Sequence, residues 1–139
     1  MRKITLIILI FLSSVSFEIQ AQCGGTTVKT TTPTSIGFVI YSNDVETVWN
    51  ALRLANFSAN AGDTVKIFLL GKGVELDTLA KKNSDIKEQT EIFLNAGGVI
   101  LGCGTCLQSR NNLAPQMCKM SSMSDLYDII RKSKTVITF

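Results

Sequence analysis

Two cysteines separated by two residues, Cys103 and Cys106, are the groups in this chain best suited to covalent chemistry. They follow an apolar run at 98–102, which is typical of a buried strand, and they precede residues 107–110, which predict the first turn of a helix. A cysteine at such a junction lies near free backbone N–H groups and the positive end of the helix dipole, which favour a nucleophilic thiolate. The chain contains no histidine, so this chemistry must proceed without an imidazole base.

Two functions and one structural role fit this cysteine pair. In the first, Cys103 alone accepts a sulfane sulfur and holds it as a persulfide, which a helix N-terminus stabilises with N–H donors. In the second, Cys103 and Cys106 form a dithiol/disulfide couple, in which Cys103 attacks and Cys106 resolves. The structural role is a disulfide or an inert, half-buried pair of thiols. The catalytic candidates are therefore Cys103 and Cys106.

Other kinds of site have weaker support in the sequence. Cys103, Cys106 and Cys118 supply three thiolates, but the second cysteine pair or the histidines of a structural zinc site are missing, so we expect no metal and no cofactor. Nucleophilic sites that need a histidine are excluded. Gly71 and Gly73 lack the third glycine of a dinucleotide-binding loop and predict only a turn. Cys118 itself either approaches the pair or packs as a small hydrophobe.

Arg110 is a further candidate because it follows Cys103 by seven residues, about two turns along the predicted helix. On one interpretation it lies on the same face and helps to hold an anion. On the other it is a solvated basic residue that interacts favourably with the C-terminal end of the helix dipole.

The N-terminal residues have the layout of a secretory signal peptide. Two basic residues precede an apolar stretch at 4–12 and a small-residue cleavage site, which predicts a signal peptide over residues 1–21. The apolar stretch is shorter than the roughly 20 residues that span a bilayer, so we expect no stable membrane span and an exported, periplasmic protein. Cys23 raises the alternative of a lipid anchor, which Gln22 disfavours because such sites require a small residue before the cysteine.

Composition limits the partners and the way the fold is held together. The net charge of +3, from 14 basic and 11 acidic residues, is too small to indicate nucleic-acid binding. Four cysteines are too few for a disulfide scaffold, so a hydrophobic core must stabilise the chain. The length of 139 residues suits one domain. We divide the chain into a signal peptide (1–21), a flexible leader (22–34) and an α/β domain (35–139).

Strands and helices alternate along this domain. Apolar runs predict strands at 36–41, 65–70, 99–102 and 135–139, with a short additional strand near Met117. Apolar stripes at helical spacing predict helices over about 44–60, around 86–94 and up to about 132, with a shorter helical piece at 76–81. Asn43 or Asp44 is expected to cap the first helix, with Glu46 and Asn43 as a loose capping box, and Gly62 is expected to end it. Ser122 and Asp125 have the spacing of a capping box at the start of the last helix.

This alternation predicts a mainly parallel sheet of about five strands with helices on both faces. Ligands of such sheets bind beyond the carboxyl ends of the strands. The segments 42–44 and 71–73 and residue Cys103 each follow or end a strand, so we expect them to share one rim.

These segments resemble the DsrE/DsrF-like family, including its YchN-type members. The resemblance covers residues 36–139. It is carried by the first helix, the second strand, the cysteine loop and the chain ending, at residues 46–56, 62–71, 103–110, and 123–130 with 135–139. Asn111 stands where a glycine is common in the family, and Asn tolerates the left-handed conformation better than most residues.

The resemblance implies a three-layer α/β/α sandwich, often assembled into homotrimers or homohexamers. It also implies sulfur relay, because better-understood members relay sulfur as a cysteine persulfide on the position of Cys103. Cys106 matches a second cysteine found in some branches. The implied function is a sulfur carrier or sulfurtransferase, whose partners are a sulfur donor or acceptor protein or a small sulfur compound. The alternatives are a non-enzymatic, oligomeric module that binds a small ligand or partner at the rim, and a C-x-x-C thiol–disulfide oxidoreductase.

Overall fold

The computed structural model describes residues 32–139. The elements follow in the order β1 (Ser35–Ile40), α1 (Val45–Asn60), β2 (Thr64–Leu69), the 3-10 helix η1 (Gly71–Glu75), α2 (Leu76–Lys82), α3 (Ser84–Asn95), β3 (Val99–Cys103), α4 (Gly104–Gln108), β4 (Lys119–Ser121), α5 (Met123–Lys132) and β5 (Thr135–Thr138). The predicted signal peptide and most of the predicted leader lie outside the described residues, so export stays a prediction. Within 32–139, no helix has the length and apolar character needed to cross a membrane.

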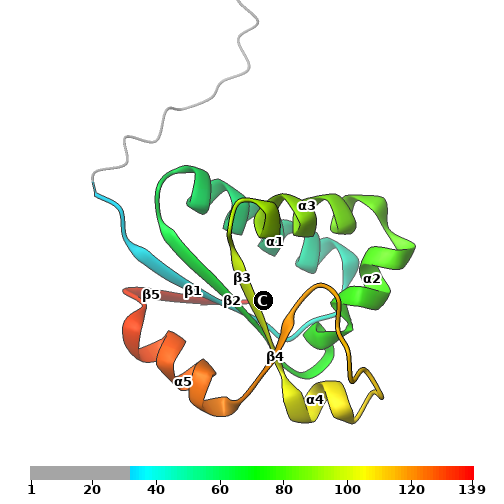
Figure 1. Ribbon diagram of the computed structural model, residues 1–139. Coiled ribbons are helices and arrows are strands. Elements are labelled where there is room, and N and C mark those ends of the chain that lie inside the picture. The colour runs from blue at the N-terminus through cyan, green and yellow to red at the C-terminus, as the bar shows by residue number, and fades with distance from the viewer. Residues whose placement is uncertain (1–31) are drawn as a thin grey trace, which may run out of the picture.

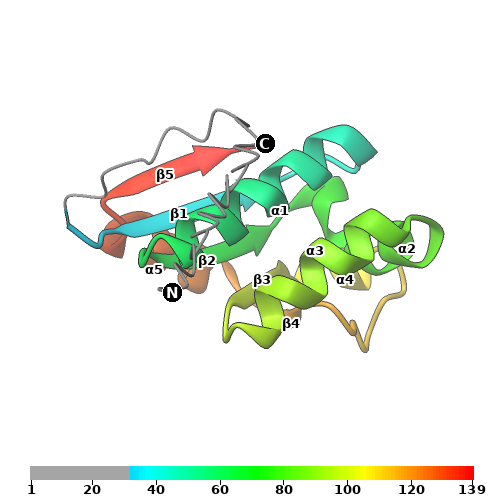
Figure 2. The same cartoon turned by 90° about the horizontal axis from the view of Figure 1, so that it is seen from above.

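A five-stranded parallel sheet in the order β4-β3-β2-β1-β5 forms the middle layer. Helices α1 and α3 lie side by side over one face, and α5 covers the other (Figures 1 and 2). This arrangement confirms the predicted α/β fold with a parallel sheet between helical layers.

The larger core lies between the sheet and the α1/α3 layer. A β-carbon placed on Gly37 would come within 2.6 Å of Ile129 on α5, so the glycine allows that helix to pack closely against β1. Because side chains alternate along a strand, the neighbouring Phe38 points to the opposite face. There it lies in register with Ile67 and Ile100, and all three side chains are buried. Burial of such side chains is the main source of stability.

The first helix is capped by Asp44, one of the two residues expected there. Its Oδ1 accepts a hydrogen bond from the backbone N–H of Thr47 at 2.9 Å. The alternative, in which Asn43 and Glu46 form a capping box, is wrong, because the Asn43 side chain binds elsewhere. Gly62 has φ +98° and ends the helix as predicted.

The cysteine helix is shorter and starts earlier than expected. It begins at Gly104 and ends at Gln108, so Arg110 lies beyond it. The helix stops because Asn111 is left-handed, with φ +55°, and because Asn112 N–H folds back to the Leu107 carbonyl at 3.0 Å. Asn111 therefore adopts the left-handed conformation that asparagine is expected to tolerate.

Two smaller differences concern the segments around this helix. The additional strand is β4, which begins at Lys119 instead of near Met117. The glycine turn after β2 is the start of η1.

The capping box predicted for the last helix is present, with Ser122 and Asp125 bonded reciprocally.

Candidate functional site

The loops that follow β1, β2 and β3 meet at the carboxyl ends of these strands, and we call this edge the strand-end rim. Asn43, after β1, donates from Nδ2 to Glu75 Oε2 at 2.9 Å. Arg110, after β3, donates from Nε to Glu75 Oε1 at 2.8 Å. Glu75 ends η1, which follows β2, so one carboxylate joins all three loops and confirms the predicted rim.

Cys103 is both the last residue of β3 and the N-cap of α4. Its residue surface is only 4% exposed, and it lines a groove of about 540 Å³. We call this the cysteine groove; its other lining residues are Gly104, Thr105, Gln108, Met120, Ser121, Ser122, Met123 and Asp125. The groove thus lies between α4 and the segment that joins β4 to α5.

Cys106 lies one helical turn further on, with the Cys103 thiol as a neighbour, and it is partly buried. Burial raises the pKa of Cys106, and the neighbouring Cys103 sulfur raises it further. The Gly71 backbone N–H and the Arg110 guanidinium oppose this rise without cancelling it. Burial thus favours the protonated form of Cys106.

Arg110 binds an anion, but that anion is the protein's own carboxylate. Besides its 2.8 Å bond to Glu75, its Nη1 donates to the Cys106 carbonyl at 3.1 Å. The argument that placed it on a helix face with Cys103 is wrong, because α4 ends before it. Hydrogen bonds from Arg110 and then from Asn43 hold the pKa of Glu75 below its usual value, with further attraction from Lys72.

Cys118 packs as a core side chain. It is buried, and a β-carbon on Gly102 would lie 2.8 Å from its sulfur. Burial raises the pKa of the Cys118 thiol to about 12, with a contribution from Asp77. Cys103, Cys106 and Cys118 are all free thiols. Residues 32–139 contain no cluster of three or more histidine, cysteine or acidic side chains arranged to hold a metal ion.

Two carboxylates that the sequence did not indicate organise this region. Glu75 joins the rim, and Asp77 holds the loop that returns from α4 to β4. Asp77 Oδ2 accepts from Asn112 Nδ2 and Gln116 N at 3.0 Å, and its Oδ1 accepts from Met117 N at 2.9 Å. Their partners lie more than thirty residues away in the sequence, so no local motif signals them.

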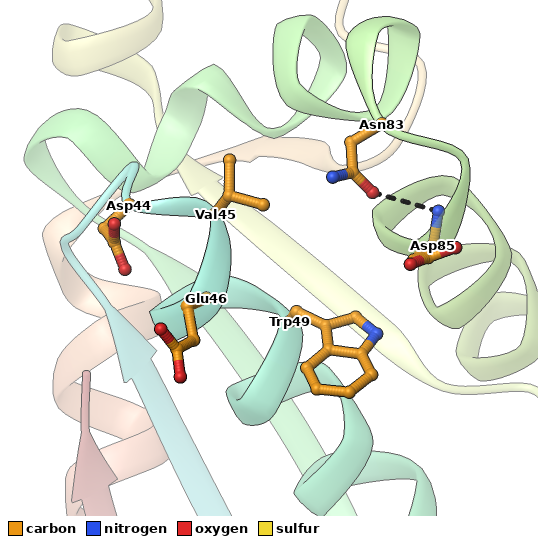
Figure 3. A pocket seen from close by; sticks show the side chains of 6 residues that line it. All are labelled: Asp44, Val45, Glu46, Trp49, Asn83 and Asp85. Carbon is orange, nitrogen blue, oxygen red and sulfur yellow. Dashed lines mark hydrogen bonds between the residues drawn. The ribbon is translucent and has the colours of Figure 1, made fainter.

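A second hollow, of about 360 Å³, lies between the N-terminal ends of α1 and α3 (Figure 3). Two of its polar side chains serve as helix caps: Asp44 accepts from Thr47, and Asn83 accepts from the backbone of Asp85, the bond drawn in Figure 3. Arg53 lies 4.3 Å from the centre of the Trp49 ring that lines the hollow. These groups are satisfied by neighbouring residues, so the cysteine groove remains the candidate site.

Comparison with known proteins finds relatives of this sequence. An uncharacterised protein of Methanocaldococcus jannaschii is 31% identical over 100 residues, which cover 68% of this chain and 88% of that protein. Another, from Methanopyrus kandleri, is 27% identical over 100 residues, with 68% and 83% covered.

Two solved structures share the fold at low sequence identity. The crystal structure of the YchN protein from Escherichia coli has a TM-score of 0.67 at 18% identity, covering 78% of this chain and all of that one. A conserved protein of unknown function from Bacteroides thetaiotaomicron has a TM-score of 0.64 at 17% identity, covering 76% and 95%. The model of the DsrE/DsrF-like family matches residues 34–139, and the chain therefore belongs to the DsrE/DsrF-like family.

Proposed function

We propose that this protein handles sulfane sulfur and carries it as a persulfide on Cys103. The observation that supports this most directly is the division between the two cysteines. Cys103 lines the groove at a strand-to-helix junction, whereas burial favours the protonated form of Cys106 one turn further on. Membership of the DsrE/DsrF-like family supports the same chemistry, because its better-understood members relay sulfur.

The transfer step needs no metal or redox cofactor. The Cys103 thiolate attacks the outer sulfur of a donor persulfide, R–S–SH, and a new S–S bond forms as the donor's S–S bond breaks. The donor leaves as a thiolate, and Cys103 holds –S–SH. Cys106 can then attack the inner sulfur of this persulfide, which closes a Cys103–Cys106 disulfide and releases hydrosulfide.

Mass spectrometry of the reduced protein after exposure to polysulfide or thiosulfate tests the proposal. A gain of one sulfur atom is expected, lost in Cys103→Ser and kept in Cys106→Ser. Cys118→Ser is the matched control, because that thiol is buried and should not react. If no cysteine gains sulfur from either donor, the proposal is wrong.

A thiol–disulfide oxidoreductase is the second candidate, favoured by two neighbouring free thiols, Cys103 and Cys106, one helical turn apart. It predicts that a mild oxidant removes two hydrogen atoms from the pair and that a dithiol restores them. Rapid, reversible closure without sulfur uptake would support this function over sulfur carriage.

The proposed setting includes export and self-association. The signal-peptide pattern at 1–21 supports export to the periplasm, and the exposed Tyr127 and Ile130 on α5 offer apolar surface to a second copy. Fractionation of cells that express the full chain tests export. Light scattering of the purified protein tests for a homotrimer or homohexamer, and a monomer would contradict this part of the proposal.

A further inference from the structure

The strand-end rim contains a chain of hydrogen bonds that ends on the cysteine loop. Glu75 uses both carboxylate oxygens, one for Asn43 and one for Arg110. Arg110 in turn donates from Nη1 to the Cys106 carbonyl at 3.1 Å and to Ser109 Oγ at 3.3 Å. The guanidinium is therefore committed to a carboxylate and to oxygen atoms of the cysteine loop.

The same short element, η1, holds Cys106 from two sides. At its start, the Gly71 backbone N–H lies near the Cys106 sulfur and lowers the pKa of that thiol. At its end, Glu75 fixes the arginine that binds the Cys106 carbonyl. A charge-assisted contact of 2.8 Å between Arg110 and Glu75 is among the stronger hydrogen bonds in proteins, so this contact restrains the cysteine loop.

The negative charge of Glu75 on η1 is paired with the positive charge of Arg110. The charged and titratable groups on the segments around α4 are Cys103 on β3, Lys72 and Glu75 on η1, Lys119 on β4, Asp125 on α5 across the cysteine groove, and Arg110 beyond α4. Arg110 attracts the thiolate form of Cys106, and Glu75 offsets that positive charge. Without the carboxylate, the arginine charge would act on the two sulfur atoms uncompensated.

We propose that Glu75 is a positioning residue for the cysteine pair: by holding Arg110 on the Cys106 carbonyl, it keeps the guanidinium off the sulfur atoms and reserves Cys106 as a proton donor. This inference rests on the proposed function. It gives the two cysteines separate roles, since Cys103 carries the sulfur while Cys106 supplies the proton.

The proton has a defined destination in the transfer step. Cys103–S⁻ and R–S–SH give Cys103–S–SH and R–S⁻, and the leaving thiolate then takes the proton of Cys106 to become R–SH. The net change converts one thiolate, one thiol and one donor persulfide into one persulfide, one thiolate and one free thiol. Atoms and charge balance, and no external oxidant is needed.

The Glu75→Gln variant of the full chain removes the charge and keeps an oxygen that can accept a hydrogen bond. Alkylation of each cysteine is followed by peptide mass spectrometry as a function of pH. The midpoint for Cys106 should move to lower pH in Glu75→Gln, by about half a unit or more, and to higher pH in Arg110→Gln. Glu91→Gln is the matched control, because Glu91 forms only an exposed pair with Lys87 and should leave the midpoint unchanged.

A second measurement follows where sulfur is placed after exposure to polysulfide. The wild type should load Cys103, whereas Glu75→Gln should divide the sulfur between Cys103 and Cys106. An unchanged Cys106 midpoint in both Glu75→Gln and Arg110→Gln overturns the inference, even where the wild type loads sulfur. If the wild type loads no sulfur, the proposed function fails, while the alkylation midpoints still decide whether Glu75 positions the pair. Since the two substitutions predict opposite shifts, a loss of stability common to both cannot imitate the result.

Discussion

Gly102 and Cys118 lie so close together that no side chain fits on the glycine. A β-carbon on Gly102 would be 2.8 Å from Cys118 Sγ and 3.1 Å from Leu107 Cδ1. Both neighbours are buried and cannot move into solvent. Gly102→Ala is therefore expected to lower the free energy of unfolding by about 1–3 kcal/mol, measured by urea denaturation.

Removal of the sulfur provides the control for this prediction. In Cys118→Ala the sulfur atom beside Gly102 is gone, so adding Gly102→Ala should lower the free energy of unfolding much less than it does in the wild type. Such non-additivity is expected only for residues in contact. If Gly102→Ala lowers the free energy of unfolding equally in the wild type and in Cys118→Ala, the contact with Cys118 is not what excludes a side chain at position 102.

Cys118 should also make the fold sensitive to alkaline pH. Burial raises the pKa of its thiol to about 12, whereas an unfolded thiol titrates near pH 8.5. Between these values the unfolded chain releases a proton that the folded chain keeps, so stability falls as pH rises, by up to about 1.4 kcal/mol per pH unit. Below about pH 8 both states keep the proton, and this loss is absent.

Urea denaturation of the wild type and Cys118→Ala at pH values from about 7 to 10.5 measures this effect. The lysines and tyrosines that titrate in the same range are common to both proteins, so their contribution cancels in the difference. The wild type should lose stability more steeply than the variant. If the free energy of unfolding falls equally with pH in both proteins, burial does not raise the pKa of the Cys118 thiol.

Asp77 is expected to hold the loop between α4 and β4 in place. Its carboxylate accepts hydrogen bonds from the backbone N–H groups of Gln116 and Met117 and from the Asn112 side chain. Asp77→Ala leaves these donors without their partner, which should cost about 1–3 kcal/mol. Hydrogen exchange of residues 112–118 should accelerate more than that of β1. Asp128→Ala, which removes an exposed ion pair with Lys132, should change stability far less.

The fold was predictable from the sequence because its signals are local. Apolar runs gave the strands of the parallel sheet, and helical stripes ending at residues such as Gly62 gave the larger helices. The capping box at Ser122 and Asp125 was also correct, since it needs only a four-residue pattern. Cys103 was found at its strand-to-helix junction for the same reason.

The surroundings of the cysteines were not predictable in the same way. Glu75 meets Arg110 across 35 residues and Asn43 across 32, and neither spacing has a sequence signature. The length of α4 was overestimated because its end depends on one backbone conformation, at Asn111, which periodicity does not reveal. The cysteine groove depends on β4, whose three residues are too few to show alternation.

Asn111 ends α4 in the left-handed conformation, with φ +55°, and its substitutions should reveal this. Asn111→Gly should keep or slightly raise stability, since glycine adopts positive φ without steric cost. Asn111→Ala should lower the free energy of unfolding by about 1 kcal/mol, because a β-carbon without the local hydrogen bonds of asparagine is disfavoured there. Urea denaturation measures both.

The matched control is Asn50→Gly in the middle of α1, where the backbone is helical. There glycine should cost up to about 1 kcal/mol, the opposite of its effect at position 111. A loss on Asn111→Gly as large as that on Asn50→Gly would contradict a left-handed Asn111. Because Asn111 N–H bonds to the Gln108 carbonyl and Asn112 N–H to that of Leu107, Asn111→Ala should also increase hydrogen exchange at these two amides.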